Sequence, residues 1–343
     1  MTDNKEYVQF LNDLKSKIKK AQYQAYRTVN KELISLYWDI GKSIVEKQEK
    51  LGWGQKIIQQ LAEDLQKEFP KNSGFSERNL KYMRKFYVEY KDKPKVQPLV
   101  AQIPWSHNLI ILDKTKNDYE KEYYCRMVVR HGWSKRILAH QIETKSFERF
   151  ITGSKSHNFD KTLPVKMLKK VRPAIKDTYM LGFLEISEDI KERELENKLI
   201  ERIKDFLLEL GVGFTFMGNQ YKIVLGENEY FIDLLFYHRH LKCLIAVDLK
   251  IGKFAPEYAG KMNFYLNLLD DKVKLQGENP SIGLILCKEK DNIVVEYALR
   301  NIKKPVGVAK YYLTRKLPAK LLKQLPSPSV IEDKLKELEE KEG

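Results

Sequence analysis

Two aspartates and a lysine interrupt neighbouring apolar segments in the second half of the chain. Asp233 lies within the run 230–237, and Asp248 and Lys250 lie within the run 241–250. Both runs are rich in β-branched and aromatic residues and flank a short polar turn, which predicts a β-hairpin. If the strands fold back about this turn, residues whose numbers sum to about 481 face each other, so Asp233 and Asp248 share one face with Cβ atoms about 5 Å apart.

This spacing predicts a metal site with an amine beside it. Side chains alternate faces along a strand, so Lys250 shares the face of Asp248, about 7 Å along. Two ionised carboxylates this close repel each other, and beside a dry core they are costly unless a cation neutralises them. Hard oxygen ligands suit Mg²⁺ or Mn²⁺, which could assist attack on a phosphodiester. An alternative stays open, because Asp-x-Lys is a common tripeptide that mostly marks a solvated strand end.

The charge distribution favours a polyanionic partner. The chain has 343 residues and a net charge of +15, and it is long enough for two domains that each bury a core. Residues 1–150 hold 29 Lys/Arg against 19 Asp/Glu, so a net charge of +10 lies in under half of the chain. Nucleic acid is the commonest partner of such a region. A basic surface that serves only solubility is the alternative.

Other features bound the class of protein. The sequence has no stretch near the ~18 apolar residues that would span a bilayer, and it opens without the apolar segment of a secretory signal. Its cysteines, Cys125, Cys243 and Cys287, fit neither a zinc spacing nor a disulfide framework. We therefore expect a cytoplasmic protein with buried thiols and no membrane contact.

The N-terminal half reads as helices. Helical periodicity predicts helices over 4–50 and 55–69, and Ser76 is a suitable N-cap for a third helix that ends near Tyr90. Residues 92–118 lack clear periodicity and are predicted as a loop with a structured turn at 103–107, followed by three or four helices between 118 and 175.

A helix, a glycine-containing turn and a basic helix together outline a helix-turn-helix unit, whose second helix would enter the major groove of DNA. An ordinary helical hairpin with a solvated basic face is the alternative. The candidate nucleic-acid-binding residues are Arg78, Asn79, Lys81, Arg84, Lys85 and, in the C-terminal half, Lys253.

The C-terminal half reads as an α/β domain. An amphipathic helix is predicted over 189–210, and Glu196 lies at the edge of its apolar stripe. The remaining elements are strands over 214–217, 221–225, 231–237, 243–249, 282–287 and 306–308, and helices over 256–269, 292–299 and 330–341. Four segments are expected: a helical, basic, DNA-binding domain at 1–155, a connecting helix and lead-in at 156–188, the α/β domain at 189–325 and a helical tail at 326–343.

The order helix–strand–strand–strand–helix–strand, with acids on the second and third of these strands, resembles the restriction-endonuclease-like core of PD-(D/E)XK nucleases, an αβββαβ mixed sheet. Almost the whole chain resembles the YhcG-like bacterial family, in which a helical N-terminal domain precedes such a nuclease domain. The phrases that carry the resemblance are Tyr37-Trp-Asp-Ile-Gly, Gly74-Phe-Ser-Glu-Arg-Asn-Leu, Ile103-Pro-Trp-Ser-His-Asn, Phe206-Leu-Leu-Glu-Leu-Gly, Phe231-Ile-Asp-Leu-Leu-Phe-Tyr-His and Ser281-Ile-Gly-Leu-Ile-Leu-Cys.

The resemblance implies roles for five residues. Asp233 matches the first motif acid, Asp248 the second acidic position and Lys250 the motif lysine. Glu196 matches a helix acid that often completes the metal site, and Gln220 a glutamine near it. Asp248 departs from the family, which usually has glutamate there, and this puts the rate and the metal preference in doubt.

We therefore expect an endonuclease that hydrolyses phosphodiester bonds in DNA with Mg²⁺ or Mn²⁺, positioned by its N-terminal domain. Asp233, Asp248 and Glu196 would hold the metal, and Lys250 would orient the attacking water or stabilise the growing negative charge. One alternative is a DNA-binding regulatory or structural protein with a silent nuclease fold, and another is an RNA nuclease of a defence type. Cutting of both strands would suggest a homodimer, whereas nicking would not.

Overall fold

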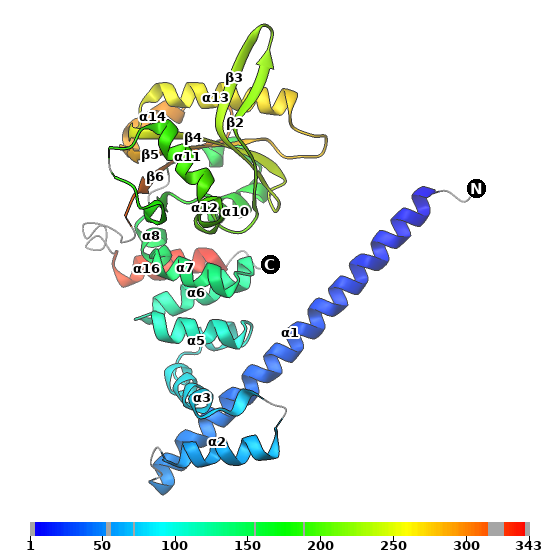
Figure 1. Ribbon diagram of the computed structural model, residues 1–343, viewed down its shortest axis with the longest axis vertical. Helices are drawn as coiled ribbons and strands as arrows, with labels where there is room; N and C mark the ends of the chain where they lie inside the picture. Colours follow the sequence, from blue (N-terminus) through cyan, green and yellow to red (C-terminus); the bar gives the residue numbers. More distant parts are fainter. Residues whose placement is uncertain are drawn as a thin grey trace. The chain divides into compact units, whose positions relative to one another are not determined.

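The computed structural model describes residues 4–52, 56–70, 73–153, 156–187, 189–314 and 326–339. The chain divides into two compact units, Met1–Leu138 and Ala139–Gly343. In the described residues the first unit is helical, whereas the second contains a six-stranded mixed sheet with helices (Figure 1). The expected fold class is therefore confirmed. None of the helices in the described ranges combines the length and the apolar composition needed to cross a membrane.

The helices of the first unit agree with the sequence prediction as far as Tyr90. The complete set in the described residues is α1 Asn4–Leu51, α2 Lys56–Glu68, the 3₁₀ turn η1 Ser73–Phe75, α3 Glu77–Tyr90, α4 Gln97–Val100, α5 Trp105–Lys114, α6 Asp118–His131 and α7 Lys135–Glu143, which runs across the boundary between the units. The Ser76 side chain caps α3 by accepting from the backbone N–H of Asn79. Residues Trp53 and Gly54 lie outside the described residues.

The prediction of a loop over 92–118 is wrong, because this segment contains the whole of α4 and of α5. The segment predicted as a turn at 103–107 begins α5, with Pro104 extended at its N-cap. His107, Asn108, Ile111 and Leu112 are buried, at the spacing of one helical face. Two polar members within this stripe conceal its periodicity in the sequence. The helices α8 Ser146–Thr152, α9 Phe159–Thr162 and α10 Val165–Ala174 follow, so five helices lie where three or four were expected in the described part of 118–175.

The sheet of the second unit has the strand order β1-β6-β5-β4-β3-β2. Its strands are β1 Thr178–Met180, β2 Phe214–Leu225, β3 Asn228–His238, β4 Cys243–Lys253, β5 Ile282–Glu289 and β6 Val306–Tyr312. Pairs β2·β3 and β3·β4 are antiparallel, whereas β4·β5, β5·β6 and β6·β1 are parallel. The helices are α11 Glu192–Glu201, α12 Ile203–Leu210, α13 Pro256–Lys272, α14 Asn292–Leu299 and α16 Pro328–Glu339.

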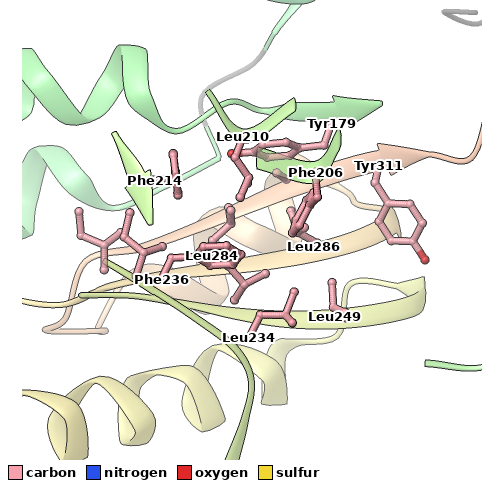
Figure 2. Close-up of a cluster of buried hydrophobic side chains, with 14 of the residues drawn as sticks. Tyr179, Phe206, Leu210, Phe214, Leu234, Phe236, Leu249, Leu284, Leu286 and Tyr311 are labelled. Atoms are coloured by element: carbon pink, nitrogen blue, oxygen red, sulfur yellow. The ribbon is translucent and has the colours of Figure 1, made fainter. Parts of the chain in front are cut away.

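Apolar side chains cover both faces of this sheet. One cluster, which includes Leu199 of α11, joins α11 and α12 to the sheet. Figure 2 shows part of it, with Phe206 of α12 and Phe236 of β3. The other joins α13 and α14 to the opposite face through residues such as Leu266 and Ile285. Burial on both faces explains why β4 and β5 read as almost unbroken apolar runs, and why a charged residue in either strand requires a partner.

Three predicted elements of the second unit differ from the structure. The helix expected over 189–210 is broken at Arg202, whose backbone leaves the helical region with φ −109° and ψ 31°. The strands expected at 214–217 and 221–225 form the single strand β2, because pairing with β3 continues past a β-bulge between Phe216 and Gly218. The expected lead-in contributes β1, which pairs in parallel with β6.

Candidate active site

The antiparallel pairing of β3 with β4 stops beside the two aspartates. It runs from the turn to Leu234↔Val247, whose numbers sum to 481 as the sequence predicts. Beyond this pair, β3 continues alongside β2, and β4 continues alongside β5. The two strands therefore fork, and Asp233 and Asp248 are the first residues on the two sides of the fork.

Side chains fill the space that the fork opens. The backbone N–H of Leu249 donates to Oδ2 of Asp233 at 2.8 Å, so a carboxylate takes the place of a strand partner. Val247 and Leu249 pack in the cluster covered by α11 and α12. The alternation of side chains therefore turns Asp248 and Lys250 toward α13, beside the carboxylate of Asp233.

Two ammonium groups hold the buried carboxylate of Asp248, which is 2% exposed. Its Oδ2 lies 2.9 Å from Nζ of Lys250, and its Oδ1 lies 3.1 Å from Nζ of Lys261 on α13. The Lys250 ammonium also donates to the backbone carbonyl of Leu249 at 2.8 Å and lies 3.4 Å from Oε2 of Glu192. Burial lowers the pKa of Lys250, but the Asp248 carboxylate outweighs this effect and raises the pKa above its ordinary value.

The electrostatics of Asp233 differ from those of an ordinary aspartate. The pKa of this carboxyl is raised from 3.8 to about 6, by burial first and by the neighbouring charge of Asp248 second. The Leu249 N–H and the charges of Lys250 and Lys261 act in the opposite direction. Burial, the largest of these effects, disfavours the ionised carboxylate. A cation bound near Asp233 would offset this cost and favour the ionised form.

Glu196 and Gln220 contact each other from α11 and β2. Glu196 accepts from Nε2 of Gln220 at 2.6 Å and from Nδ2 of Asn219 at 3.1 Å. Gln220 lies between the pairs that flank Asp233 in the β2·β3 register, and its backbone has a φ of +43°. This left-handed conformation is uncommon for a residue other than glycine, and such residues concentrate at functional sites.

Glu196 does not join the aspartates in a metal-binding cluster. Within the described ranges, no group of three or more His, Cys, Asp or Glu side chains lies together as a candidate metal site. The apolar neighbours of Glu196 on α11, Leu195 and Leu199, pack on the face of the sheet away from α13. The role of Glu196 as a third ligand therefore stays a prediction.

The oxygens at the fork suit a hard cation. Asp233, Asp248 and the Leu249 carbonyl supply the carboxylate and carbonyl donors that Mg²⁺ and Mn²⁺ take. Oδ2 of Asp248 is buried and, among the described residues, has no hydrogen bond in addition to its ion pair with Lys250. The Lys250 ammonium contacts this oxygen and the Leu249 carbonyl at once. A positive charge is thus already held between two of the candidate ligands.

Lys261 is the site residue that the sequence did not reveal. Its side chain is 42% exposed, whereas that of Lys250 is 8% exposed, so Lys261 is the more accessible of the two amines. It projects from α13, where Ala259 and Met262 are buried. A lysine between buried residues of a helix next to an Asp-x-Lys strand was the available signal.

The predicted nucleic-acid-binding residues of α3 do not behave alike. Arg78, Lys81, Arg84 and Lys85 lie at least partly exposed. Asn79 instead braces the fold: its Nδ2 donates to the carbonyl of Gly74 at 2.5 Å and its Oδ1 accepts from Nε1 of Trp105 at 2.7 Å. An amide used in this way is not available to a base edge without breaking these bonds. Lys253 is exposed at the end of β4 in the second unit.

Ion pairs modify the charge of this helix. Lys81 pairs with Glu77 at 2.6 Å and Lys85 pairs with Asp113 at 2.8 Å. Arg78 lies over the ring of Tyr82, 5.7 Å from its centroid. Exposed pairs of this kind exchange readily for phosphate contacts because each contributes little in water. Binding of DNA by α3 stays a prediction.

Comparison with known proteins gives matches over most of the chain. Residues 172–326 match the YhcG PDDEXK nuclease domain, and residues 13–149 match the DUF1016 N-terminal domain. The protein named "Putative nuclease YhcG" from Escherichia coli (strain K12) is 32% identical over 348 residues, which cover 92% of this chain and 90% of that relative. No solved structure matches the chain.

Proposed function

Because the chain belongs to the YhcG family of PDDEXK nucleases, we propose that it is a Mg²⁺- or Mn²⁺-dependent endonuclease that hydrolyses phosphodiester bonds of DNA at the β3–β4 fork. The observation that carries this proposal is the buried carboxylate of Asp248, which pairs with the ammonium groups of Lys250 and Lys261 and lies close enough to Asp233 to raise the pKa of that carboxyl. An ion bound at the fork would polarise the scissile phosphate and lower the pKa of a water. We further propose the nuclease domain at 189–325 and the DNA-binding domain at 1–155.

Each residue of the fork has a proposed task. Asp233, Asp248 and the Leu249 carbonyl would hold the cation. Glu196 does not lie in one group with the aspartates in the described part of this structure, so it would have to approach them to become a further ligand. Gln220 positions Glu196 through the 2.6 Å hydrogen bond between their side chains. Lys250, buried and fixed by Leu249 and Asp248, orients the attacking water.

Lys261 is proposed to contact the phosphate. Its side chain is partly exposed, and it reaches the candidate ligands through its ion pair with Asp248. The Lys261 ammonium would leave this ion pair and stabilise the negative charge that develops on the phosphate oxygens, because a cation held by Asp248 would compete for the same carboxylate. In the first unit, Arg78, Lys81, Arg84 and Lys85 would contact the DNA backbone without reading its sequence.

A side-by-side cleavage assay tests the proposal. Purified protein is incubated with linear, nicked, branched and single-stranded DNA and with RNA, each with Mg²⁺, Mn²⁺ or EDTA. We expect Mg²⁺-dependent cutting of DNA that Asp233→Ala abolishes and that the exposed control Glu227→Gln leaves unchanged. Binding of DNA by Asp233→Ala in EDTA should persist.

Three results would contradict the proposal in different ways. Salt-sensitive DNA binding without any metal-dependent cutting would favour a regulatory protein with a silent nuclease fold. Cutting of RNA alone would favour an RNA nuclease. Cutting by Asp233→Ala at the wild-type rate would mean that the fork is not the site of the reaction.

A further inference from the structure

The first part of α1 extends beyond the core of its own unit. Arg27 of α1 donates to Oε1 of Gln102 at 3.1 Å, and Asn30 donates to the carbonyl of Ile103 at 3.2 Å; both partners lie between α4 and α5. Within the described residues, buried side chains of α1 begin at Ile34. In Figure 1, α2 and α3 lie along the C-terminal part of α1. A helical segment of about 20 residues without tertiary packing is marginal in water, so this segment calls for a partner.

An apolar stripe follows this unpacked segment. Its large members are separated by 3, 4, 7 or 11 residues, which return to one face of a helix. They are Tyr7, Leu14, Ile18, Val29, Leu33 and Leu36, with exposed fractions that include 56% for Ile18 and 67% for Val29. The residues that α1 buries in its own unit, such as Ile34 and Tyr37, lie about 120° further around the helix. The exposed side chains from Tyr7 to Val29 therefore lie off the packed face of α1, and the stripe meets that face only near Ile44, which is buried with Tyr37.

The same stripe leads into a groove at the other end of α1. Leu36, Ile40 and Ile44 form one wall, and Ile57, Leu61 and Leu65 of α2 form the other. The groove has a volume of about 670 Å³ and is lined almost entirely by apolar groups. One helix thus carries an exposed apolar stripe in one half and an open apolar groove in the other half.

We propose that α1 pairs with α1 of a second copy of this chain, antiparallel, about a two-fold axis near Val29. In this arrangement Ile18 of each copy faces Ile40 of its partner, and Leu14 faces Ile44, so each unpacked half fills the groove of the other copy. A two-fold interface of this kind closes on itself and uses the same surface twice. The proposal does not depend on the nuclease assignment.

Charge favours this direction over a parallel pair. Residues 4–28 hold six Lys/Arg against two Asp/Glu, a net charge of +4, whereas residues 30–51 hold four of each. Helix α2, which forms the second wall of the groove, holds two Lys against three Asp/Glu. A parallel pair would place the two basic halves side by side, and an antiparallel pair places each one against a neutral half and an acidic helix.

Nucleic acid is the competing partner for a basic helix. It would neutralise the lysines of residues 15–20 but would leave the aromatic and aliphatic stripe in water, together with the groove. Apolar surface of this extent is typical of a contact between proteins. A second copy covers the stripe and the groove at once.

Sedimentation velocity of the full chain tests the pairing. We expect a dimer for the wild type without DNA, and dissociation by Leu14→Glu/Ile18→Glu with a dimer dissociation constant at least about 100-fold higher, because the charges would be buried in the pair. The matched control Gln9→Glu/Ser16→Glu adds the same charge to the same segment on the opposite face and should remain dimeric. Circular dichroism checks that both variants keep their helix.

Disulfide trapping tests the direction and the register. The native cysteines Cys125, Cys243 and Cys287 are buried, so background cross-linking should be low. Under mild oxidation, a mixture of Ile18→Cys and Ile40→Cys proteins should cross-link, whereas Ile18→Cys alone should not.

Any of four results would overturn the pairing: a wild-type monomer at tens of micromolar, association only when duplex DNA is added, equal dissociation of both double variants, or rapid cross-linking of Ile18→Cys with itself.

Discussion

Replacing Asp233 by asparagine should stabilise the second unit at neutral and alkaline pH in the absence of metal. The folded protein shifts the pKa of this carboxyl from 3.8 to about 6 through burial first and the charge of Asp248 second. A shift of about 2 units at roughly 1.4 kcal/mol each corresponds to about 3 kcal/mol of unfavourable free energy when Asp233 is ionised. Since Asp233 is partly exposed and solvent screens its charge, we expect a measured gain of about 1–3 kcal/mol.

The stability difference between Asp233→Asn and the wild type should depend on pH in one direction only. The folded state holds the proton of Asp233 more tightly than the unfolded state does, so the full stability is present below the ordinary pKa near 3.8 and is lost as the pH rises through about 6. The asparagine side chain would not titrate, and its amide oxygen could still accept from the Leu249 N–H. The advantage of Asp233→Asn should therefore be absent near pH 4, grow up to about pH 6 and stay constant above it.

Guanidinium unfolding read by two signals separates the units. All four tryptophans, Trp38, Trp53, Trp105 and Trp133, lie in residues 1–138, so tryptophan fluorescence follows the first unit while far-ultraviolet circular dichroism follows both. In Asp233→Asn, only the unfolding transition of the second unit, which circular dichroism detects and tryptophan fluorescence does not, should move to higher guanidinium concentration. The control Glu227→Gln should move neither transition. Adding Mg²⁺ should reduce the difference in free energy of unfolding between Asp233→Asn and the wild type, because an ion that needs the ionised carboxylate stabilises the wild type alone. An asparagine variant as stable as the wild type at pH 8, or a gain of equal size at pH 4, would refute the reasoning.

Three further substitutions probe other features. Lys261→Gln should lower the rate of single-turnover DNA cleavage about 10- to 100-fold, yet increase Mg²⁺-induced stabilisation, since one competitor for Asp248 is removed; an unchanged rate would exclude a phosphate contact. Glu209→Gln should destabilise the second unit by about 3–5 kcal/mol in guanidinium unfolding, because it removes the negative charge that lies 2.6 Å from the buried guanidinium of Arg149; a loss below about 1 kcal/mol would mean that the charges are solvated. Gly41→Ala should lower the stability reported by tryptophan fluorescence by about 1–3 kcal/mol, because its Cβ would lie 2.1 Å from the carbonyl oxygen of Met83 on α3; an unchanged transition would show that α1 and α3 can separate without cost.

The apolar patterns predicted most of the second unit. Strands β3, β4 and β5 and helix α14 lie where the sequence indicates, because strands buried on both faces leave unbroken apolar runs and short turns. The register of β3 and β4 followed from the length of their turn alone. It predicted that Asp233 faces Asp248; in the structure the ladder ends one pair earlier, at Leu234↔Val247, and the charge of Asp248 still acts on Asp233.

Elements that depend on contacts between distant parts of the chain could not be predicted from the sequence. Strand β1 is three residues long and depends on pairing with β6, whose partner residues run from Lys310 to Tyr312. The break at Arg202 and the bulge in β2 leave no mark in the spacing of apolar residues, so the sequence pattern could not predict them. Lys261 was missed for a related reason: only the packing of α13 on the sheet brings its ammonium to Asp248.

The place where β3 parts from β4 has a consequence for evolution and for design. The chemistry of a site is usually set by which side chains are present. Here the accessibility of the carboxylates also depends on how many residue pairs β3 and β4 form. A substitution that let β3 and β4 form one more ladder pair past Leu234↔Val247 would close the fork and draw Leu249 away from Asp233. Such a change would abolish the proposed cleavage while every charged residue of the candidate site kept its identity.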